Sequence, residues 1–227
     1  REFVGTLEDD TIIYTMFDLE QYLGQEIDWV TGLTFEEVIQ TKGGWLPSKH
    51  RRFCTTWLKM VPIADWWRTK FNEEPVQMNI GYRANETNRA KTMQDKLNAD
   101  GLNEIKTIIG KHPSGRNKWG TFAWRKPLFP LVKDGVYKMD VENFWKDKPV
   151  RFAEYNNCVG CFHKRTAQLK YQWQKHPEKM QWFADKEGGK KGYWRQDLSY
   201  EKIKDLELTG NLFDKNSLGC DSGFCGM

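Results

Sequence analysis

The chain is organised around the stretch Asn157-Cys158-Val159-Gly160-Cys161-Phe162-His163, which carries two cysteines separated by two residues. A tight turn between two such cysteines brings their side chains together, so that both sulfurs can bind one metal ion. Cys54, in Arg51-Arg52-Phe53-Cys54-Thr55, is a third candidate ligand. These three thiols and His163 form a candidate zinc site, and the alternative is that the cysteines are buried free thiols.

The composition sets the class of protein. The 227 residues are 39% hydrophobic and 29% charged, and they include 11 tryptophans. This length is enough for one domain with a sizeable core, or for one domain with a small appendage. No run of about 18 apolar residues is present, so we expect no membrane span. The chain begins with Arg1 rather than methionine, and no signal-peptide pattern follows, so we expect a natural N-terminus further upstream.

Charge and cysteine content narrow the class further. The 35 basic and 31 acidic residues give a net charge of +4, which is too small to indicate nucleic-acid binding by itself. The five cysteines are too few for a disulfide framework in a chain of this length. Metal-binding or redox cysteines in a reducing, cytoplasmic environment fit this composition better.

Apolar periodicity and turn residues predict alternating helices and strands. We expect helices at 12–23, 34–39, 55–70, 88–97 and 140–145, and a longer helical region at 164–185 broken at Pro177. We expect strands at 27–30, 76–81 and 105–109, and a polar loop at 112–120. This alternation implies an α/β fold with a mostly parallel sheet flanked by helices. Residues 1–150 would form the α/β domain, and residues 151–227 a helical, cysteine-containing extension packed on it.

Five segments in order carry recognisable motifs. They are Thr6-Leu7-Glu8; Arg52-Phe53-Cys54-Thr55 with Leu58, Lys59 and Pro62; Ile80-Gly81-Tyr82-Arg83-Ala84-Asn85-Glu86 with Arg89; Phe129-Pro130-Leu131 with Val141 and Trp145; and Asn157-Cys158 with Cys161. Together they resemble the phosphoadenosine phosphosulfate (PAPS) reductase family, within the adenine-nucleotide α-hydrolase or ATP-pyrophosphatase-like fold. The chain looks most like the short forms found in phages and their bacterial hosts.

Two family motifs are missing from the sequence. The Ser-Gly-Gly-x-Asp-Ser loop, whose backbone N–H groups cradle nucleotide phosphates, would lie upstream of Arg1 or has been lost. The Glu-Cys-Gly nucleophile motif of the reductases is replaced by Cys220-Asp221-Ser222-Gly223-Phe224-Cys225. Because thiols in a tail can reach an active site, Cys225 and Cys220 are the candidate catalytic cysteines. The alternative is a tail whose cysteines carry no chemistry.

The resemblance implies two kinds of site. In one group of the family, cysteines at these positions hold a 4Fe–4S cluster; with Phe53 replacing one of them, the ligands here would be Cys54, Cys158 and Cys161, with zinc as the competing metal. An adenine nucleotide would be bound by residues following the strands, namely Thr6, Glu8, Arg52, Arg83, Glu86 and Arg89. A guanidinium suits phosphate or sulfate oxygens. The alternative for Arg83, Glu86 and Arg89 is a surface ion-pair cluster.

The sequence therefore predicts a PAPS-reductase-like enzyme that binds an adenine nucleotide or sulfonucleotide and reduces or transfers sulfur, with a thiol reductant protein as partner. Two rivals stay open. One is a DNA or tRNA thiolation enzyme on the same fold, for which a nucleic acid is the partner. The other is a non-catalytic, metal-stapled structural or regulatory member.

Overall fold

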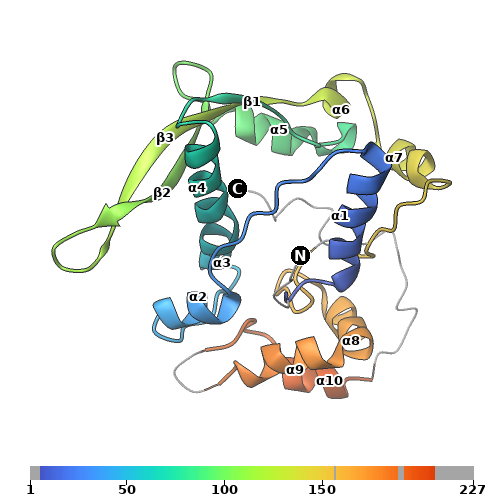
Figure 1. Ribbon diagram of the computed structural model, residues 1–227. Coiled ribbons are helices and arrows are strands. Elements are labelled where there is room, and N and C mark those ends of the chain that lie inside the picture. The colour runs from blue at the N-terminus through green and yellow to red at the C-terminus, as the bar shows by residue number, and fades with distance from the viewer. Residues whose placement is uncertain (1–5, 156, 189–191, 208–227) are drawn as a thin grey trace. The chain divides into compact units, whose positions relative to one another are not determined.

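The computed structural model describes residues 6–155, 157–188 and 192–207 (Figure 1). The chain divides into two compact units. Unit 1 takes its described residues from Arg1–Ile27, Leu33–Thr55 and Pro149–Met227, and unit 2 consists of Asp28–Gly32 and Thr56–Lys148. None of the described helices combines the length and the apolar character needed to cross a membrane. The predicted division near residue 150 stays a prediction.

Unit 1 is helical in its described part. It contains α1 (Asp10–Leu23), α2 (Phe35–Thr41), α3 (Phe53–Thr55), α8 (Thr166–Lys175), α9 (Pro177–Asp185) and α10 (Tyr200–Asp205). The predicted helices at 12–23 and 34–39 are confirmed, and so is the break at Pro177. Capping explains the first two: the Asp9 side chain accepts from the Thr11 N–H at 2.9 Å, and Thr34 and Glu37 form a capping box.

Large aromatic side chains fill the core of unit 1. Trp194 and Tyr200 are fully buried with Phe183, and the edges of Phe35 meet the rings of Phe183 and Trp194. The indole N–H of Trp194 donates to the Phe183 carbonyl at 2.7 Å, so burial leaves no unsatisfied donor there. This core holds α8, α9 and α10 together, and the three helices lie side by side in orange to red in Figure 1.

Unit 2 contains a three-stranded sheet in the order β1-β3-β2, with β1 (Val76–Asn79), β2 (Asn103–Lys111) and β3 (Asn117–Leu128). β1 pairs with β3 in parallel, and β2 pairs with β3 antiparallel. The α/β class is confirmed, but the sheet is mixed rather than mostly parallel. The reason is a hairpin: residues 112–120, expected as a loop, hold only a short turn before β3 begins. The expected strand at 27–30 is wrong, since these residues pair with no strand in the described chain.

The remaining elements of unit 2 are the π-helical turn η1 (Thr56–Met60), α4 (Val61–Lys70), the short 3₁₀ turn η2 (Ala84–Glu86), α5 (Thr87–Gln94), α6 (Pro130–Lys133) and α7 (Lys138–Trp145). The π-helical turn precedes Pro62, which has no N–H to continue the α-helical pattern. Trp67 of α4 packs against Ile105 and Trp124 of the sheet. The Asn103 side chain donates to the Met93 carbonyl, which attaches α5 to the same sheet.

β3 contains a β-bulge and a proline. Asn103 pairs with Arg125 while Glu104 pairs with Ala123, so Trp124 is the extra residue. Pro127 follows three residues later and pairs with Met78 of β1 only, because the β2 pairing ends at Arg125. Proline has no N–H to donate to a neighbouring strand. It is therefore tolerated where its strand has a neighbour on one side only.

Candidate functional site

The two cysteines of unit 1 lie in a closed turn. The N–H of Cys161 donates to the carbonyl of Cys158 at 3.0 Å, and the N–H of Lys164 donates to the carbonyl of Cys161 at 2.9 Å. Both cysteines are half-buried. We refer to residues 158–161 as the cysteine turn. Its hydrogen bonds agree with the tight turn predicted from the spacing.

Glycine is required inside the cysteine turn. A Cβ at Gly160 would lie 2.4 Å from two ring atoms of Phe183, closer than carbon atoms can approach. The Gly160 carbonyl accepts a 3.0 Å hydrogen bond from the hydroxyl of Tyr200. Tyr200 is fully buried, and this burial raises the pKa of its hydroxyl well above the ordinary value. The hydroxyl therefore stays protonated and keeps donating to the turn.

A buried lysine anchors the other side of the turn. The Lys164 side chain, 3% exposed, donates to the carbonyl of Cys158 at 2.6 Å and to the carbonyl and side-chain oxygens of Asn157. Lysine is rarely buried, because removing its ammonium from water is costly without such partners. The sequence contains no signal for this role: Lys164 reads as one more surface lysine.

Cys54 lies in the same unit. Cys54 and Cys158 both pack against the core cluster that contains Val159 and Phe162. Burial raises the pKa of the Cys54 thiol, and a hydrogen bond with Thr55 and the charge of Arg52 offset this only in part. The Nε of Arg52 is buried without a hydrogen-bond partner among the described residues.

The cysteines suit a metal in ligand type. Cys54, Cys158 and Cys161 belong to one unit, and thiolates are the ligands preferred by zinc and iron–sulfur clusters. His163, whose ring lies 4.7 Å from that of Phe162, is two residues further along. No group of three or more His, Cys, Asp or Glu side chains is drawn together for a metal within residues 6–155, 157–188 and 192–207.

Thr6 and Glu8 lie next to the cysteine turn. The N–H of Val159 donates to the carbonyl of Leu7 at 2.7 Å, which ties residues 6–8 to the turn. The N–H of Glu8 donates to the Thr6 hydroxyl at 3.2 Å, and the Glu8 carbonyl accepts from the Lys179 ammonium at 2.6 Å. The structure thus brings together two predicted sets, the nucleotide contacts at residues 6 and 8 and the cysteine pair.

In unit 2 the predicted anion-binding residues form one ion-pair network. The Glu86 carboxylate accepts from Arg83 Nε at 2.9 Å and from Arg89 Nη1 at 2.6 Å. Burial raises the pKa of Glu86, but the hydrogen bonds from Arg83 and Arg89 outweigh burial, so the pKa is lowered. The carboxylate stays ionised and holds both guanidinium groups. We call these three residues the arginine–glutamate cluster.

Two aromatic rings connect this cluster to a groove. The Arg89 guanidinium lies 4.3 Å from the centroid of the Tyr82 ring, and Tyr82 stacks on Phe129 with an interplanar angle of 9°. Tyr82, which the sequence did not single out, is therefore the central member of a stack. The sequence signal that could have pointed to Tyr82 is its position next to Arg83, a candidate anion-binding residue.

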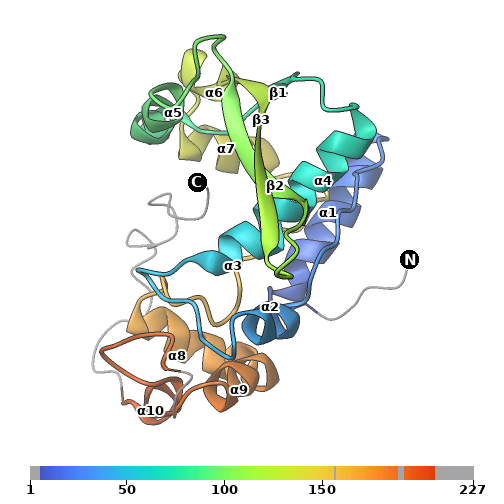
Figure 2. The same cartoon turned by 90° about the vertical axis from the view of Figure 1, so that its left-hand side faces the viewer.

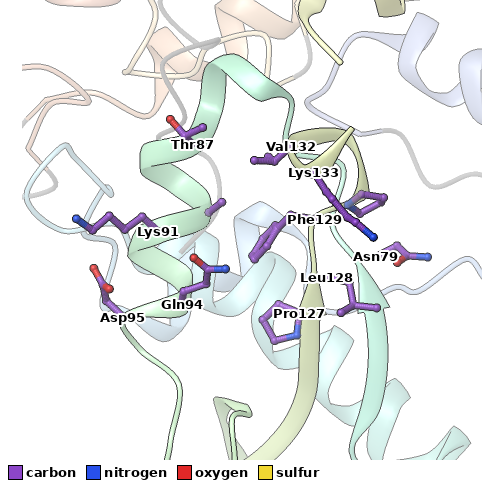
Figure 3. Close-up of a pocket in the computed structure, with 12 residues that line it drawn as sticks. Asn79, Thr87, Lys91, Gln94, Asp95, Pro127, Leu128, Phe129, Val132 and Lys133 are labelled. Atoms are coloured by element: carbon purple, nitrogen blue, oxygen red, sulfur yellow. The ribbon is translucent and has the colours of Figure 1, made fainter. Parts of the chain in front are cut away.

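Phe129 lines a groove of about 860 Å³ at the carboxyl ends of the parallel strands β1 and β3, bordered by α5 and α6 (Figure 3). Figure 3 shows the Phe129 ring between α5 on one side and Asn79 and Lys133 on the other. Open α/β sheets bind ligands at the carboxyl ends of their strands. The lining residues are Asn79, Thr87, Ala90, Lys91, Gln94, Asp95, Pro127, Leu128, Phe129, Pro130, Val132 and Lys133.

The predicted residues thus form two local sets. Thr6, Glu8 and the cysteine turn belong to unit 1, as do Cys54 and Arg52, whereas the arginine–glutamate cluster belongs to unit 2. Cys220 and Cys225 lie outside the described residues. No family model matches the chain, and comparisons with curated proteins and with solved structures found no match.

Proposed function

We propose that the chain is a PAPS-reductase-like enzyme that binds an adenine nucleotide and reduces or transfers sulfur. The observation that supports this best is the arginine–glutamate cluster, which follows a parallel strand and adjoins an aromatic stack. Glu86 orients both guanidinium groups, so their positions are set before a ligand arrives. Preorganised guanidinium groups suit phosphate or sulfate oxygens.

The groove would receive the base. Its walls are mainly apolar, with Leu128, Phe129 and Val132 among them, and Asn79 and Gln94 supply amide groups. Apolar walls with a few hydrogen-bonding groups are typical of small-molecule sites. A purine could stack on Phe129 while its edge bonds to an amide. Arg83 is the next residue after Tyr82, the stacking partner of Phe129, and would take the phosphate or sulfate.

The sulfur chemistry would belong to the cysteines. With a sulfonucleotide, a thiolate of Cys225 or Cys220 would attack the sulfur, a sulfur–sulfur bond would form, and the nucleotide would leave with the bonding electrons. The second cysteine would then displace sulfite and leave a disulfide, which a thiol reductant protein would reduce. With ATP, adenylation would precede attack by a sulfur donor. Thr6, Glu8 and Arg52 stay predicted nucleotide contacts.

A metal would be held by Cys54, Cys158 and Cys161, as a 4Fe–4S cluster or as zinc with His163. Such a cluster would supply an iron with an open coordination position that can bind sulfide, whereas a zinc ion would have a structural role. The turn around Gly160 positions two of these thiols, because Tyr200 and Lys164 bind its carbonyl groups.

Nucleotide titration of the full chain tests the proposal, with ATP, AMP and a sulfonucleotide as ligands. The substitution Arg83→Ala should weaken binding by about 1.5–3 kcal/mol, the scale of a hydrogen bond to a charged group. Arg165→Ala is the control, since this exposed arginine belongs to unit 1. Equal affinity of both variants for every nucleotide would contradict the site.

The second candidate function, a nucleic-acid thiolation enzyme, is favoured by one observation. The hairpin of β2 and β3 carries basic residues without acidic ones between residues 105 and 122. A nucleic-acid substrate would need such a surface in addition to the nucleotide site.

A further inference from the structure

The strands β2 and β3 extend well beyond the three-stranded part of the sheet. β1 pairs only with residues 125–128 of β3, so residues 105–122 form a two-stranded hairpin, which we call the basic ribbon (Figure 2). It contains Lys106, Lys111, Arg116 and Lys118 and no aspartate or glutamate. All four basic side chains are exposed.

The basic ribbon accounts for the net charge of the protein. Without its four basic residues the chain would have 31 basic residues, equal to its 31 acidic ones. In the part of the chain that the structure describes, none of the four forms an ion pair; Arg116 Nε donates only to the Ser114 hydroxyl, at 3.3 Å. Basic residues on an ordinary solvated surface are interleaved with acidic ones, and this segment is not.

The register places an aromatic ring among these charges. Trp119 pairs with Ile108, while Lys106 pairs with Thr121 and Lys111 with Asn117. Alternate residues of a strand face the same way, and directly paired residues share a face. Lys106, Trp119 and Lys111 therefore lie on one face of the ribbon. Trp119 is 41% exposed, although its ring meets the buried Trp57 edge-on at 5.8 Å.

We propose that the basic ribbon binds single-stranded nucleic acid. An exposed aromatic ring flanked by cations is the arrangement that receives unpaired bases, because a base stacks on the ring while lysines contact the phosphates on either side. In a duplex the bases are already stacked on one another, so a ring on a strand face gains little there. The Trp57 contact holds the Trp119 ring in place, which lowers the entropy lost on stacking.

This proposal does not rest on the nucleotide site, because it concerns different residues and a different probe. The test is fluorescence anisotropy of a labelled 20-nucleotide oligothymidylate with the full chain between 50 and 200 mM salt. Trp119→Ala should weaken binding roughly 5-fold to 150-fold, the loss of one base–aromatic stack. Lys106→Ala with Lys111→Ala should lower the slope of log K against log salt by about 1.4, since each lost phosphate contact on a single strand contributes about 0.7.

Matched controls separate binding from folding. Trp45→Ala removes another exposed tryptophan, and Lys146→Ala with Lys202→Ala makes the same change of net charge outside the ribbon; both should bind like the parent chain. Trp119→Phe keeps a stacking ring and should retain most of the affinity, which guards against a misfolded alanine variant. The proposal is overturned if the ribbon variants bind like the controls, if the parent chain does not bind the oligonucleotide, or if a duplex or polyglutamate binds as tightly.

Discussion

The N–H of Val159 donates a 2.7 Å hydrogen bond to the carbonyl of Leu7, joining two segments more than 150 residues apart in the sequence. The bond places the Thr6 and Glu8 segment against the turn that carries Cys158 and Cys161. Leu7 also packs against the core formed around Val159 and Phe183. A ligand contact at residues 6–8 and a metal at the cysteines would therefore be coupled through one peptide hydrogen bond.

Gly160→Ala should destabilise unit 1. The new methyl group would lie 2.4 Å from the Phe183 ring, and the fully buried ring cannot move without displacing Trp194. Overpacking of this kind costs about 1–3 kcal/mol. Urea unfolding followed by tryptophan fluorescence measures it. Gly81→Ala is the control, because its added methyl would meet no atom within 4 Å; an equal loss in both variants would contradict the clash.

Lys164→Met should also lower the free energy of unfolding. The substitution keeps the length of the side chain but leaves the carbonyl of Cys158 without its ammonium donor. That carbonyl keeps the N–H of Cys161 as a donor, so the cost is the loss of a hydrogen bond from a charged group, about 1.5–3 kcal/mol. Lys202→Met, at an exposed position, should change stability little. If Lys164→Met is as stable as the parent chain or more stable, the free energy needed to remove the ammonium from water is at least as large as the stabilisation from its hydrogen bonds.

The helices whose ends are marked by capping residues or proline could be predicted from the sequence. Asp9 and Gly24 mark the ends of α1, Thr34 and Glu37 the start of α2, and Pro177 the start of α9. The start of strand β3 could not be predicted in this way, because it depends on pairing with β2 and not on the residues of β3 itself. Phe122 and Trp124 alternate and both contact Trp67, but the bulge at Trp124 shifts the pairing from Arg125 onward, so the period of two does not continue along the strand.

In the candidate sites, too, the contacts between residues close in sequence were the ones that could be predicted. The cysteine spacing predicted the turn, and the spacing of Arg83, Glu86 and Arg89 predicted their contact, because both depend on residues close in sequence. The stack of Tyr82 on Phe129 depends on two segments that meet only in the folded chain. The burial of Lys164 has no sequence signal, although its partners Asn157 and Cys158 are close in the sequence. The lack of acidic residues in the basic ribbon is visible in the sequence, but only the register places Trp119 with Lys106 and Lys111.

Glu86→Gln should make the stability of unit 2 less dependent on pH. The pKa of Glu86 is lowered from 4.5 in the folded state, so its ionised form contributes stability that is present above about pH 4.5 and lost as the pH falls through the folded pKa. At pH 7 the variant should lose about 1.5–3 kcal/mol, since both guanidinium groups lose their anionic partner and the glutamine offers them only one oxygen as acceptor. The difference from the parent chain should shrink as acid is added.

Urea unfolding between pH 3 and pH 7 measures that difference. Glu142→Gln is the matched control, because this carboxylate is exposed and lies 3.7 Å from Lys138. Exposed pairs contribute little to stability, so this variant should follow the parent chain at each pH. A stability difference for Glu86→Gln that is the same at pH 3 and pH 7 would show that the carboxylate does not act through its charge.

Cys158→Ala should abolish metal binding by the full chain purified without oxygen. The closed turn positions Cys158 and Cys161 as a pair, and loss of one thiolate leaves a metal with too few ligands. Metal analysis with acid-labile sulfide and a visible spectrum distinguishes an iron–sulfur cluster from zinc. Cys225→Ala is the control, since Cys225 is a candidate nucleophile and not a ligand. Full metal retention by Cys158→Ala would reduce the cysteine turn to a structural element and favour a non-catalytic role for unit 1.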